Sequence, residues 1–171
     1  MTDSAAQEVK ILLVKQAISE VIFRYCRAMD RIDAELGYSV WHENAQVDYG
    51  SVFKGTGREF IDWVCEFHRG LVSHHHLVSN ILISIDGDVA ASESYIDTAL
   101  YMKDEKDNLQ QVCGRGRYLD NWSRRDGRWA IDQRQFVLDY ATTKQVTTDT
   151  PAWGKRDATD PSYALSPPIV G

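Results

Sequence analysis

The sequence predicts an α+β fold in which N-terminal helices pack on a strongly curved antiparallel sheet, giving a cone-shaped α+β barrel. Two observations predict it. Apolar residues recur every three or four positions early in the chain, whereas from residue 74 onward the pattern has a period of two, in four long segments. Helices that precede such a sheet lie across one of its faces, and a curved sheet half covered by helices leaves a cone-shaped cavity. With 171 residues, 43% of them hydrophobic, the chain is long enough for one core.

Three helices are expected before the long strands. The longest covers residues 4–32, and a shorter amphipathic piece follows at residues 34–41. The apolar face of the long helix consists of Val9, Leu12, Leu13, Ala17, Val21, Tyr25, Ala28 and Met29. A third helix begins after Thr56, a residue type that favours the N-cap, with Glu59 in the capping-box position, and it ends near Gly70.

One short strand and four long strands are expected. The short strand covers residues 45–49, and the long ones cover residues 74–85, 89–102, 110–124 and 129–141. Turn residues separate the long strands, so these should form an antiparallel meander. We therefore expect one cone domain over residues 1–145. Residues 146–171 should form an irregular tail that packs on the pocket mouth or on a neighbouring subunit, with disorder as the alternative.

Composition excludes several classes of partner. A formal charge of −6 and a pI near 5.3 argue against nucleic acid and anionic membranes, which need clustered Lys and Arg. Cys26, Cys65 and Cys113 are odd in number and lack CxxC spacing, so we expect buried thiols rather than a disulfide framework or a zinc knuckle. The first residues are polar, without an apolar signal segment, and no stretch approaches a membrane-spanning length. A cytoplasmic location and a small hydrophobic or aromatic substrate are expected.

Asp30 and His76 are the pair that points most directly to chemistry. Asp30 falls at the C-terminal end of the long helix, where the helix dipole disfavours a carboxylate, and His76 falls at the start of a strand. A carboxylate held against an imidazole fixes its tautomer and stabilises the imidazolium, which makes a base that works near neutral pH. From these residues alone, the alternative is a solvated aspartate and a packed histidine.

The other histidines are weighed by the face on which they lie. His74 and His76 share one face of their strand, so they could hold a metal ion in an i, i+2 arrangement. A third ligand with typical spacing is not evident, so neither a metal nor a cofactor is expected. His75 should pack or form hydrogen bonds beneath the sheet, and His42 and His68 should lie on the surface of short helices.

Several short motifs together carry a family resemblance. They are Tyr25 with Asp30, His76-x-x-x-Asn80, Ile85-Asp86-Gly87-Asp88-Val89-Ala90, Arg117-Tyr118, Arg125-Asp126-Gly127-Arg128-Trp129 and Arg134. In their order and spacing, over residues 9–140, the chain resembles the SnoaL-like branch of the nuclear transport factor 2 superfamily. Proteins with this fold include scytalone dehydratase, bile-acid 7α-dehydratase, hexachlorocyclohexane dehydrochlorinase, ketosteroid isomerase and the small subunits of ring-hydroxylating dioxygenases. The resemblance implies proton abstraction inside an apolar cone.

The resemblance also implies roles for single side chains. Asp30 and His76 match the base dyad of the dehydrochlorinase, which also occurs in bile-acid dehydratase. Tyr25 matches a pocket tyrosine of bile-acid dehydratase, whose phenol can donate to a leaving hydroxyl or to a carbonyl, and the alternative is a core aromatic on the helix face. The pocket aspartate and arginine of bile-acid dehydratase fall near Ala99 and Leu138 here, which puts its particular substrate in doubt.

Arg134 matches the arginine of the dehydrochlorinase, where a cation could help an anion to leave. The alternative is a strand arginine paired with a neighbouring acid such as Asp132 or Asp97. Further side chains are expected to bind the substrate. These are Trp41, Tyr49, Asn80, Tyr95, Asp97 and Tyr118.

Together these features predict a cofactor-independent lyase that acts by dehydration, another elimination or retro-aldol deformylation on a small hydrophobic cyclic or aromatic substrate. One alternative is a non-catalytic ligand-binding module or a dioxygenase small subunit, in which Asp30 and His76 are structural; another is a ketosteroid-isomerase-like isomerase. A homo-oligomer is also expected, a trimer before a dimer. A curved sheet exposes a broad convex face, and residues such as Leu82 and Tyr95 alternate with apolar residues of the opposite face.

Overall fold

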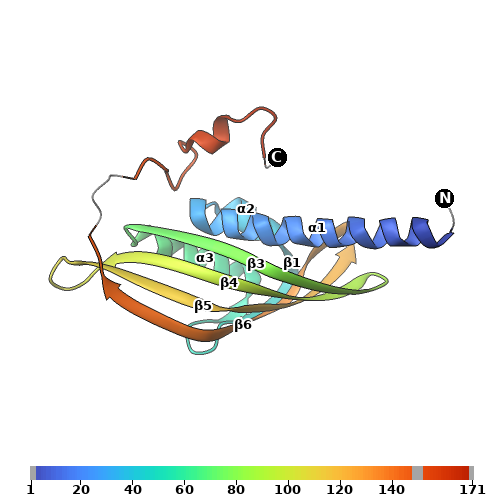
Figure 1. The fold of residues 1–171 in the computed structure, drawn as a ribbon, viewed down its shortest axis with the longest axis horizontal. Helices are drawn as coiled ribbons and strands as arrows, with labels where there is room; N and C mark the ends of the chain where they lie inside the picture. The colour runs from blue at the N-terminus through green and yellow to red at the C-terminus, as the bar shows by residue number, and fades with distance from the viewer. Residues whose placement is uncertain (1–2, 148–151, 170–171) are drawn as a thin grey trace.

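The computed structural model describes residues 3–147 and 152–169, in which three α-helices pack on a six-stranded sheet (Figure 1). The helices are α1 (Asp3–Arg31), α2 (Ala34–Ser39) and α3 (Gly57–Arg69). The strands are β1 (Trp41–Asp48), β2 (Lys54–Thr56), β3 (Ser73–Asp86), β4 (Val89–Lys103), β5 (Leu109–Arg125) and β6 (Arg128–Gln145). A short 3-10 helix, η1 (Pro161–Ala164), lies in the C-terminal segment. The predicted α+β cone is confirmed.

The sheet has the strand order β2-β1-β6-β5-β4-β3. Strands β3 to β6 form the predicted antiparallel meander. At its edge β1 pairs with β6 in parallel, with Val47 beside Arg134, so the complete sheet is mixed. This parallel pairing joins segments far apart in the sequence, and it brings β1 and the residues after it to the wide part of the cone.

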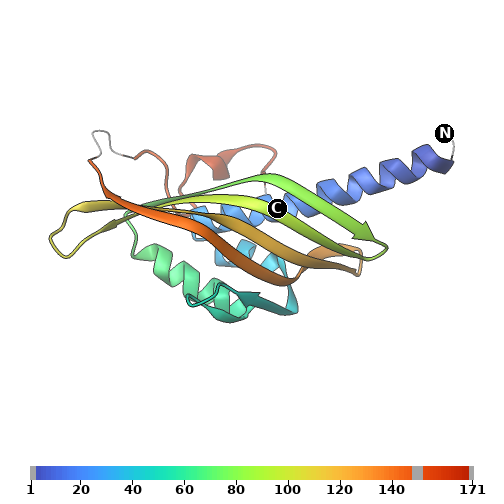
Figure 2. The same ribbon diagram turned by 60° about the horizontal axis from the view of Figure 1, so that its bottom comes forward.

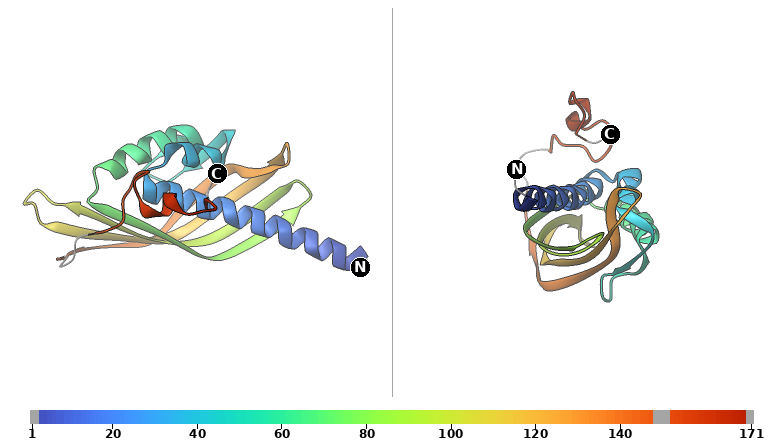
Figure 3. Two further views of the ribbon diagram at one scale, coloured as in Figure 1. Left: turned by 90° about the horizontal axis from the view of Figure 1, so that it is seen from above. Right: turned by 90° about the vertical axis from the view of Figure 1, so that its right-hand side faces the viewer.

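Irregular pairing gives the sheet its curvature. Register shifts occur between Ser79 and Leu82 in β3 and opposite two positions of β5, Arg115/Gly116 and Asn121/Trp122. An extra residue in one strand bends that strand and increases its twist. The right-hand view of Figure 3 shows the result, a sheet that curls beneath α1.

The core lies between the inner face of this sheet and the helices. Alternate residues of β4 and β5 point inward, as expected for strands, and they meet the buried face of α1 and the residues of α3 and β1. Large members of this core include Ile18, Ile22, Tyr25, Met29, Trp41, Phe60, Tyr118, Trp122 and Ile131.

Local sequence signals set the helix boundaries with mixed accuracy. The capping box of α3 is confirmed, because Thr56 Oγ1 accepts from the Glu59 N–H at 3.2 Å and the Glu59 carboxylate accepts from the Thr56 N–H at 2.8 Å. The predicted helix over residues 34–41 is too long, since Trp41 already begins β1. Strand β2 was not expected, and β6 continues past residue 141.

The first turns of α1 project beyond the sheet (Figure 2). Leu12 and Leu13, assigned from the sequence to a buried face, are therefore 64% and 65% exposed. None of the helices in the described part of the chain has the length and apolar character needed to cross a membrane. Of the three free cysteines, Cys26 and Cys65 are buried and Cys113 is half-buried.

Candidate active site

Asp30 and His76 meet inside the cone, as predicted. Asp30 lies in the last turn of α1, and its Oδ1 is 2.8 Å from His76 Nδ1, while its Oδ2 accepts a 3.3 Å bond from the backbone N–H of His76. The two side chains are 13% and 7% exposed. Because the carboxylate is an acceptor, the contact places a proton on Nδ1 and leaves Nε2 of neutral His76 with a free lone pair.

Two more histidines surround His76. The His74 ring stacks on the His68 ring with centroids 4.1 Å apart, and His68 lies 5.6 Å from His76. Burial lowers the pKa of His68 to about 3 and also lowers the pKa of His74, so both rings are neutral near pH 7. His74 Nε2 is 2.7 Å from the carbonyl oxygen of Met29, the residue before Asp30. Residues 3–147 and 152–169 contain no group of three His, Cys, Asp or Glu residues arranged to hold a metal ion.

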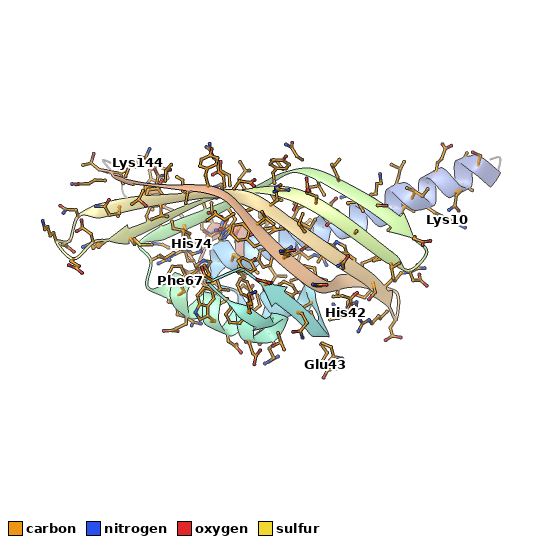
Figure 4. All side chains as sticks on the ribbon, turned by 90° about the horizontal axis from the view of Figure 1, so that it is seen from below. Lys10, His42, Glu43, Phe67, His74 and Lys144 are labelled. Atoms are coloured by element: carbon orange, nitrogen blue, oxygen red, sulfur yellow. The ribbon has the colours of Figure 1, made fainter. Side chains whose placement is uncertain are left out.

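The predictions for the remaining histidines were wrong. His68 is only 3% exposed because it lies on the inner face of α3, and His42 is 5% exposed because it belongs to β1, where its Nε2 is 3.0 Å from the carbonyl of Ser123. His75 points outward and is exposed. In Figure 4, His74 and Phe67 lie at one end of the cone and His42 lies at the other.

A second cluster forms around Tyr25. Its hydroxyl is 2.9 Å from that of Tyr49, and its ring packs edge-on against Trp41 and Tyr118. The guanidinium of Arg134 lies 4.2 Å from the centre of the Tyr25 ring, 4.0 Å from Tyr118 and 5.4 Å from Trp41. Burial raises the pKa of each of the three tyrosines, so all three phenols remain protonated. Four residues expected at the site thus come together with Arg134 in one buried aromatic box.

Arg134 is paired with Asp120, which sequence reasoning missed. Its Nε and Nη2 donate to the two carboxylate oxygens at 2.7 Å each, and both side chains are completely buried. Although burial by itself lowers the pKa of Arg134, the Asp120 charge raises it well above its ordinary value, so the group stays a cation. Arg134 Nη1 has no hydrogen-bond partner among the described residues. The acids considered from the sequence pair elsewhere, Asp132 with Arg125 and Asp97 with Arg115.

Helix α1 contributes to both clusters, because it carries Tyr25 near Arg134 and Asp30 beside His76. Cys26, next to Tyr25, is buried in the core. Burial raises the pKa of its thiol to about 12, so the thiol stays protonated.

Three predicted binding residues lie elsewhere. Tyr95 is 44% exposed, and Asp97 forms a 2.6 Å ion pair with Arg115, because odd-numbered residues of β4 point to the outer face of the sheet. Asn80 is exposed at the bulge of β3, where its φ of +48° turns the chain. None of the three faces the dyad, so their role in binding a substrate stays a prediction without support from the geometry of the dyad.

The inner surface beside His76 is lined by residues the sequence did not single out. Thr98 is the cross-strand partner of His76, and its hydroxyl donates to the carbonyl of Gly114 at 3.1 Å. A Cβ on Gly114 would meet only Thr98 Oγ1 at 3.0 Å and Leu138 Cδ1 at 3.8 Å. On α3, the rings of Trp63 and Phe67 stack with their centroids 5.8 Å apart.

Several apolar side chains of these elements are partly exposed. Leu138 follows Phe136 on the inner face of β6 and is 53% exposed, while Trp63 and Phe67 are 37% and 42% exposed. By contrast, the side chains of Arg134 and Asp120 are completely buried. Packing is therefore tight around Arg134 and looser at Leu138.

Comparison with known proteins gives the family and the fold. The SnoaL-like domain family matches residues 10–135. A type 3 hexachlorocyclohexane dehydrochlorinase from Novosphingobium barchaimii LL02 superposes with a TM-score of 0.72 at 16% identity, covering 85% of this chain and 99% of that one. A protein proposed to be a scytalone dehydratase, from Novosphingobium aromaticivorans, gives 0.69 at 22% identity, covering 90% and 98%.

A third structure, a protein proposed to be an aromatic ring hydroxylase from Novosphingobium aromaticivorans, gives a TM-score of 0.64 at 18% identity, covering 77% of this chain and 92% of that one. No curated protein matches the sequence. At these identities the likeness extends to the fold alone.

Proposed function

The chain belongs to the SnoaL-like domain family, and we propose that it is a cofactor-independent lyase whose general base is His76. The single observation that carries this proposal is the 2.8 Å contact between Asp30 Oδ1 and His76 Nδ1. A charged carboxylate against a neutral imidazole orients the ring and stabilises the imidazolium once Nε2 has taken a proton. Because His68 and His74 are held neutral by burial, His76 is the histidine of this cluster with a carboxylate to support its charge.

In the proposed elimination, His76 Nε2 removes a proton from a substrate carbon. The electron pair of the broken C–H bond becomes the new double bond, and the group on the adjacent carbon departs with its own bonding pair. In a retro-aldol variant, His76 takes the proton of a hydroxyl instead, and the C–O bond becomes a carbonyl as the C–C bond breaks. The electron pair of that C–C bond stays on the other carbon, which then takes the proton back from the His76 imidazolium. Both reactions need one base and a way to stabilise the departing charge, and neither needs electrons from outside.

Arg134 and the tyrosines supply that stabilisation in our proposal. Arg134 Nη1 is a cationic donor without a partner among the described residues, and Tyr25 and Tyr49 share one hydroxyl–hydroxyl bond, which leaves the pair a second proton to donate. In this proposal a leaving hydroxide or halide moves toward these donors, which requires the residues packed around Arg134 to admit it. We further propose that the substrate is small, hydrophobic and cyclic or aromatic, and that the partly exposed apolar side chains of Trp63, Phe67 and Leu138 contact it.

A screen in deuterated water tests the proposed function. Candidate substrates with an acidic C–H next to a leaving group, together with aromatic diols, are incubated with the protein, and products are followed by mass spectrometry. We expect loss of water, hydrogen halide or formaldehyde that requires His76. His75→Ala is the matched control, because His75 is an exposed neighbour in the same strand. Turnover that survives in His76→Ala would refute the proposal.

A non-catalytic ligand-binding module is the second candidate. The observation that favours it is the packing of Arg134 among three aromatic rings, with no exposed side-chain surface. In such a module His76→Ala would bind the same compounds as the wild-type protein, and no compound of the screen would be converted. Calorimetric titration of both proteins with each compound separates the two functions.

We also propose that the protein forms a closed homo-oligomer, a trimer before a dimer. Leu77 and Leu82 on edge strand β3 are 58% and 68% exposed, and Tyr95 on the outer face is 44% exposed. Arg117 on the same face joins Asp139 at 3.1 Å, so charged pairs border the apolar residues. Light scattering at micromolar concentration checks this: a mass of 19.5 kDa, that of one chain, would contradict it.

A further inference from the structure

The C-terminal segment, residues 152–169, crosses the end of α1 that carries Asp30 (Figures 1 and 3). Four contacts hold it to this end of the helix and to the residue that caps α2. They are Arg31 Nε to Asp160 Oδ1 at 3.4 Å, Arg27 to Ser162 Oγ at 3.3 Å, Arg27 over the Tyr163 ring at 4.9 Å, and Tyr163 to Asp33 Oδ2 at 3.1 Å. These contacts fix the segment against the last turns of α1.

Asp160 organises the segment internally. Its carboxylate is 5% exposed and accepts from the backbone N–H of Lys155 at 2.8 Å and of Ser162 at 3.0 Å. These bonds close the loop that carries Arg156. The Ser162 hydroxyl also donates to this carboxylate. This hydrogen bond and the two backbone bonds lower the pKa of Asp160, so the carboxylate stays charged beside Arg31.

Arg156 reaches from this loop to the histidine cluster. Nη1 and Nη2 donate to the carbonyl oxygens of His68 and Leu71, each at 2.8 Å, and Nη1 lies 3.3 Å from His74 Nδ1. An arginine has only donors, so Nδ1 of His74 must be the acceptor and its proton must be on Nε2. That proton points at the Met29 carbonyl, 2.7 Å away.

A continuous chain of hydrogen bonds thus runs from Arg156 through His74 to Met29. The next residue is Asp30, whose carboxylate holds His76. We propose that Arg156 is a positioning residue for the Asp30–His76 dyad: it holds His74 as the neutral Nε2–H tautomer, and His74 in turn fixes the backbone from which Asp30 projects. The dyad part of this inference rests on the proposed function, whereas the tautomer of His74 does not.

The charged groups around His74 agree with this assignment. His68 and His76 lie within 6.0 Å of its ring centre, Asp30 favours its protonation, and Arg156 opposes protonation. A proton on Nδ1 would face the guanidinium directly. Removing Arg156 should therefore free His74 to bind a proton and to compete with His76.

Nitrogen-15 spectra of histidine-labelled protein test the proposal without any substrate. We expect His74 of the wild type to show one neutral tautomer, protonated at Nε2, and Arg156→Ala to show a ring protonated on both nitrogens near pH 6, because Met29 still holds the proton on Nε2 and the guanidinium no longer opposes a proton on Nδ1. Arg69→Ala is the matched control, since Arg69 lines the same surface hollow as Arg156 but pairs with Glu66 at 2.8 Å. An unchanged His74 in Arg156→Ala would overturn the proposal.

A second variant keeps the test decisive if Arg156→Ala does not fold. Arg156→Lys retains the charge, but its one nitrogen cannot reach two carbonyls and an imidazole in the arginine geometry, so His74 should again lose its single tautomer. Wild-type spectra for this variant would likewise refute the proposal that Arg156 fixes the tautomer of His74. With a substrate in hand, Arg156→Ala should lower kcat by about 10- to 100-fold and change KM little, because the dyad is misplaced rather than the binding surface.

The two arms separate this inference from the proposed function. If His74 changes in Arg156→Ala but no compound is turned over, the role of Arg156 is supported and the lyase function is refuted. If turnover depends on His76 but His74 is unchanged in Arg156→Ala, the lyase function is supported and the role of Arg156 is refuted.

Discussion

Two acid–base pairs lie inside the same cone and differ in almost every physical respect. Asp120 and Arg134 are completely buried and joined by two parallel hydrogen bonds of 2.7 Å. Asp30 and His76 are 13% and 7% exposed and joined by one side-chain bond of 2.8 Å. The first pair includes a permanent cation, and the second includes an imidazole, a group that can exist with or without a charge.

The difference assigns a different role to each pair. A bidentate ion pair among aromatic rings has its charges fixed, so Asp120–Arg134 stabilises the interior and presents a constant positive group. The Asp30–His76 pair can gain a proton, since the imidazolium would be stabilised by the carboxylate. Thr98 is the cross-strand neighbour of His76. Under the proposed function, the chemistry is therefore assigned to the Asp30–His76 pair and the stability to the Asp120–Arg134 pair.

The largest effect is expected at His76. Given a substrate, His76→Ala should lower turnover by a factor on the order of 10²–10⁴, the usual range for a positioned general base, while the fold persists. Circular dichroism and single-turnover kinetics measure both quantities.

Asp30→Asn should reduce turnover to a similar extent, because it keeps the shape and removes the charge that stabilises imidazolium. Near-wild-type turnover in this variant would mean that the carboxylate serves only the structure. In that case the contrast between the two pairs would disappear.

Asp120→Asn should act on stability instead. It leaves Arg134 charged, buried and without its counter-ion, which costs about 3–5 kcal/mol of unfolding free energy. Urea unfolding checks the value. Asp97→Asn is the control, since Asp97 is 40% exposed in its pair with Arg115 and should cost about 0–1 kcal/mol. Equal losses of unfolding free energy in the two variants would show that burial does not determine how much an ion pair contributes to stability.

The buried histidines beside the dyad should make the stability of the protein depend on pH. The folded-state pKa of His68 is about 3, against an ordinary 6.5, so between these values the unfolded chain binds a proton that the folded chain does not. Stability therefore falls as pH falls through this window, by about 1.4 kcal/mol per pH unit for this one ring. His74 adds in the same direction, because its pKa is also lowered by burial.

Comparison of the wild type with His68→Gln isolates this contribution. Between pH 6.5 and about 4.5, where carboxylates contribute least, the variant should lose stability less steeply with acid. Urea unfolding at several pH values provides the slopes. Equal slopes would mean that His68 is protonated in the folded protein, and the interpretation of His76 as the group that takes the proton would need revision.

The elements that the sequence predicts best are those whose signals are local. The capping box from Thr56 to Glu59 lies within four consecutive residues, and each long period-two segment needs only its own alternation. The contact of Asp30 with His76 was predictable because a carboxylate at a helix end requires a partner. The family resemblance supplied Tyr25 and Arg134 as candidates.

The features that could not be predicted from the sequence depend on strand register and on packing between distant segments. Asp120 meets Arg134 only because the two are directly opposite across β5 and β6, after a bulge that counting along either strand does not reveal. The alternation of β4 could have excluded Tyr95 and Asp97 from the inner face, since Ile96 between them is buried. The parallel pairing of β1 with β6 has no local signal, so the burial of His42 could not be foreseen.

The smallest effect is expected at the hydroxyl pair of the arginine box. Tyr49→Phe removes the 2.9 Å bond to Tyr25 but keeps the ring that stacks on Phe60 at 4.5 Å and on Phe136 at 5.1 Å. Loss of one such bond should cost about 0.5–1.5 kcal/mol of unfolding free energy. Tyr25→Phe removes the same bond and should cost the same, so the two variants are matched for stability. The two variants should differ in turnover. If Tyr25 donates to the leaving group, Tyr25→Phe loses more activity than Tyr49→Phe. Equal activities would mean that Arg134 and the tyrosines around it have a purely structural role, in contrast to the dyad.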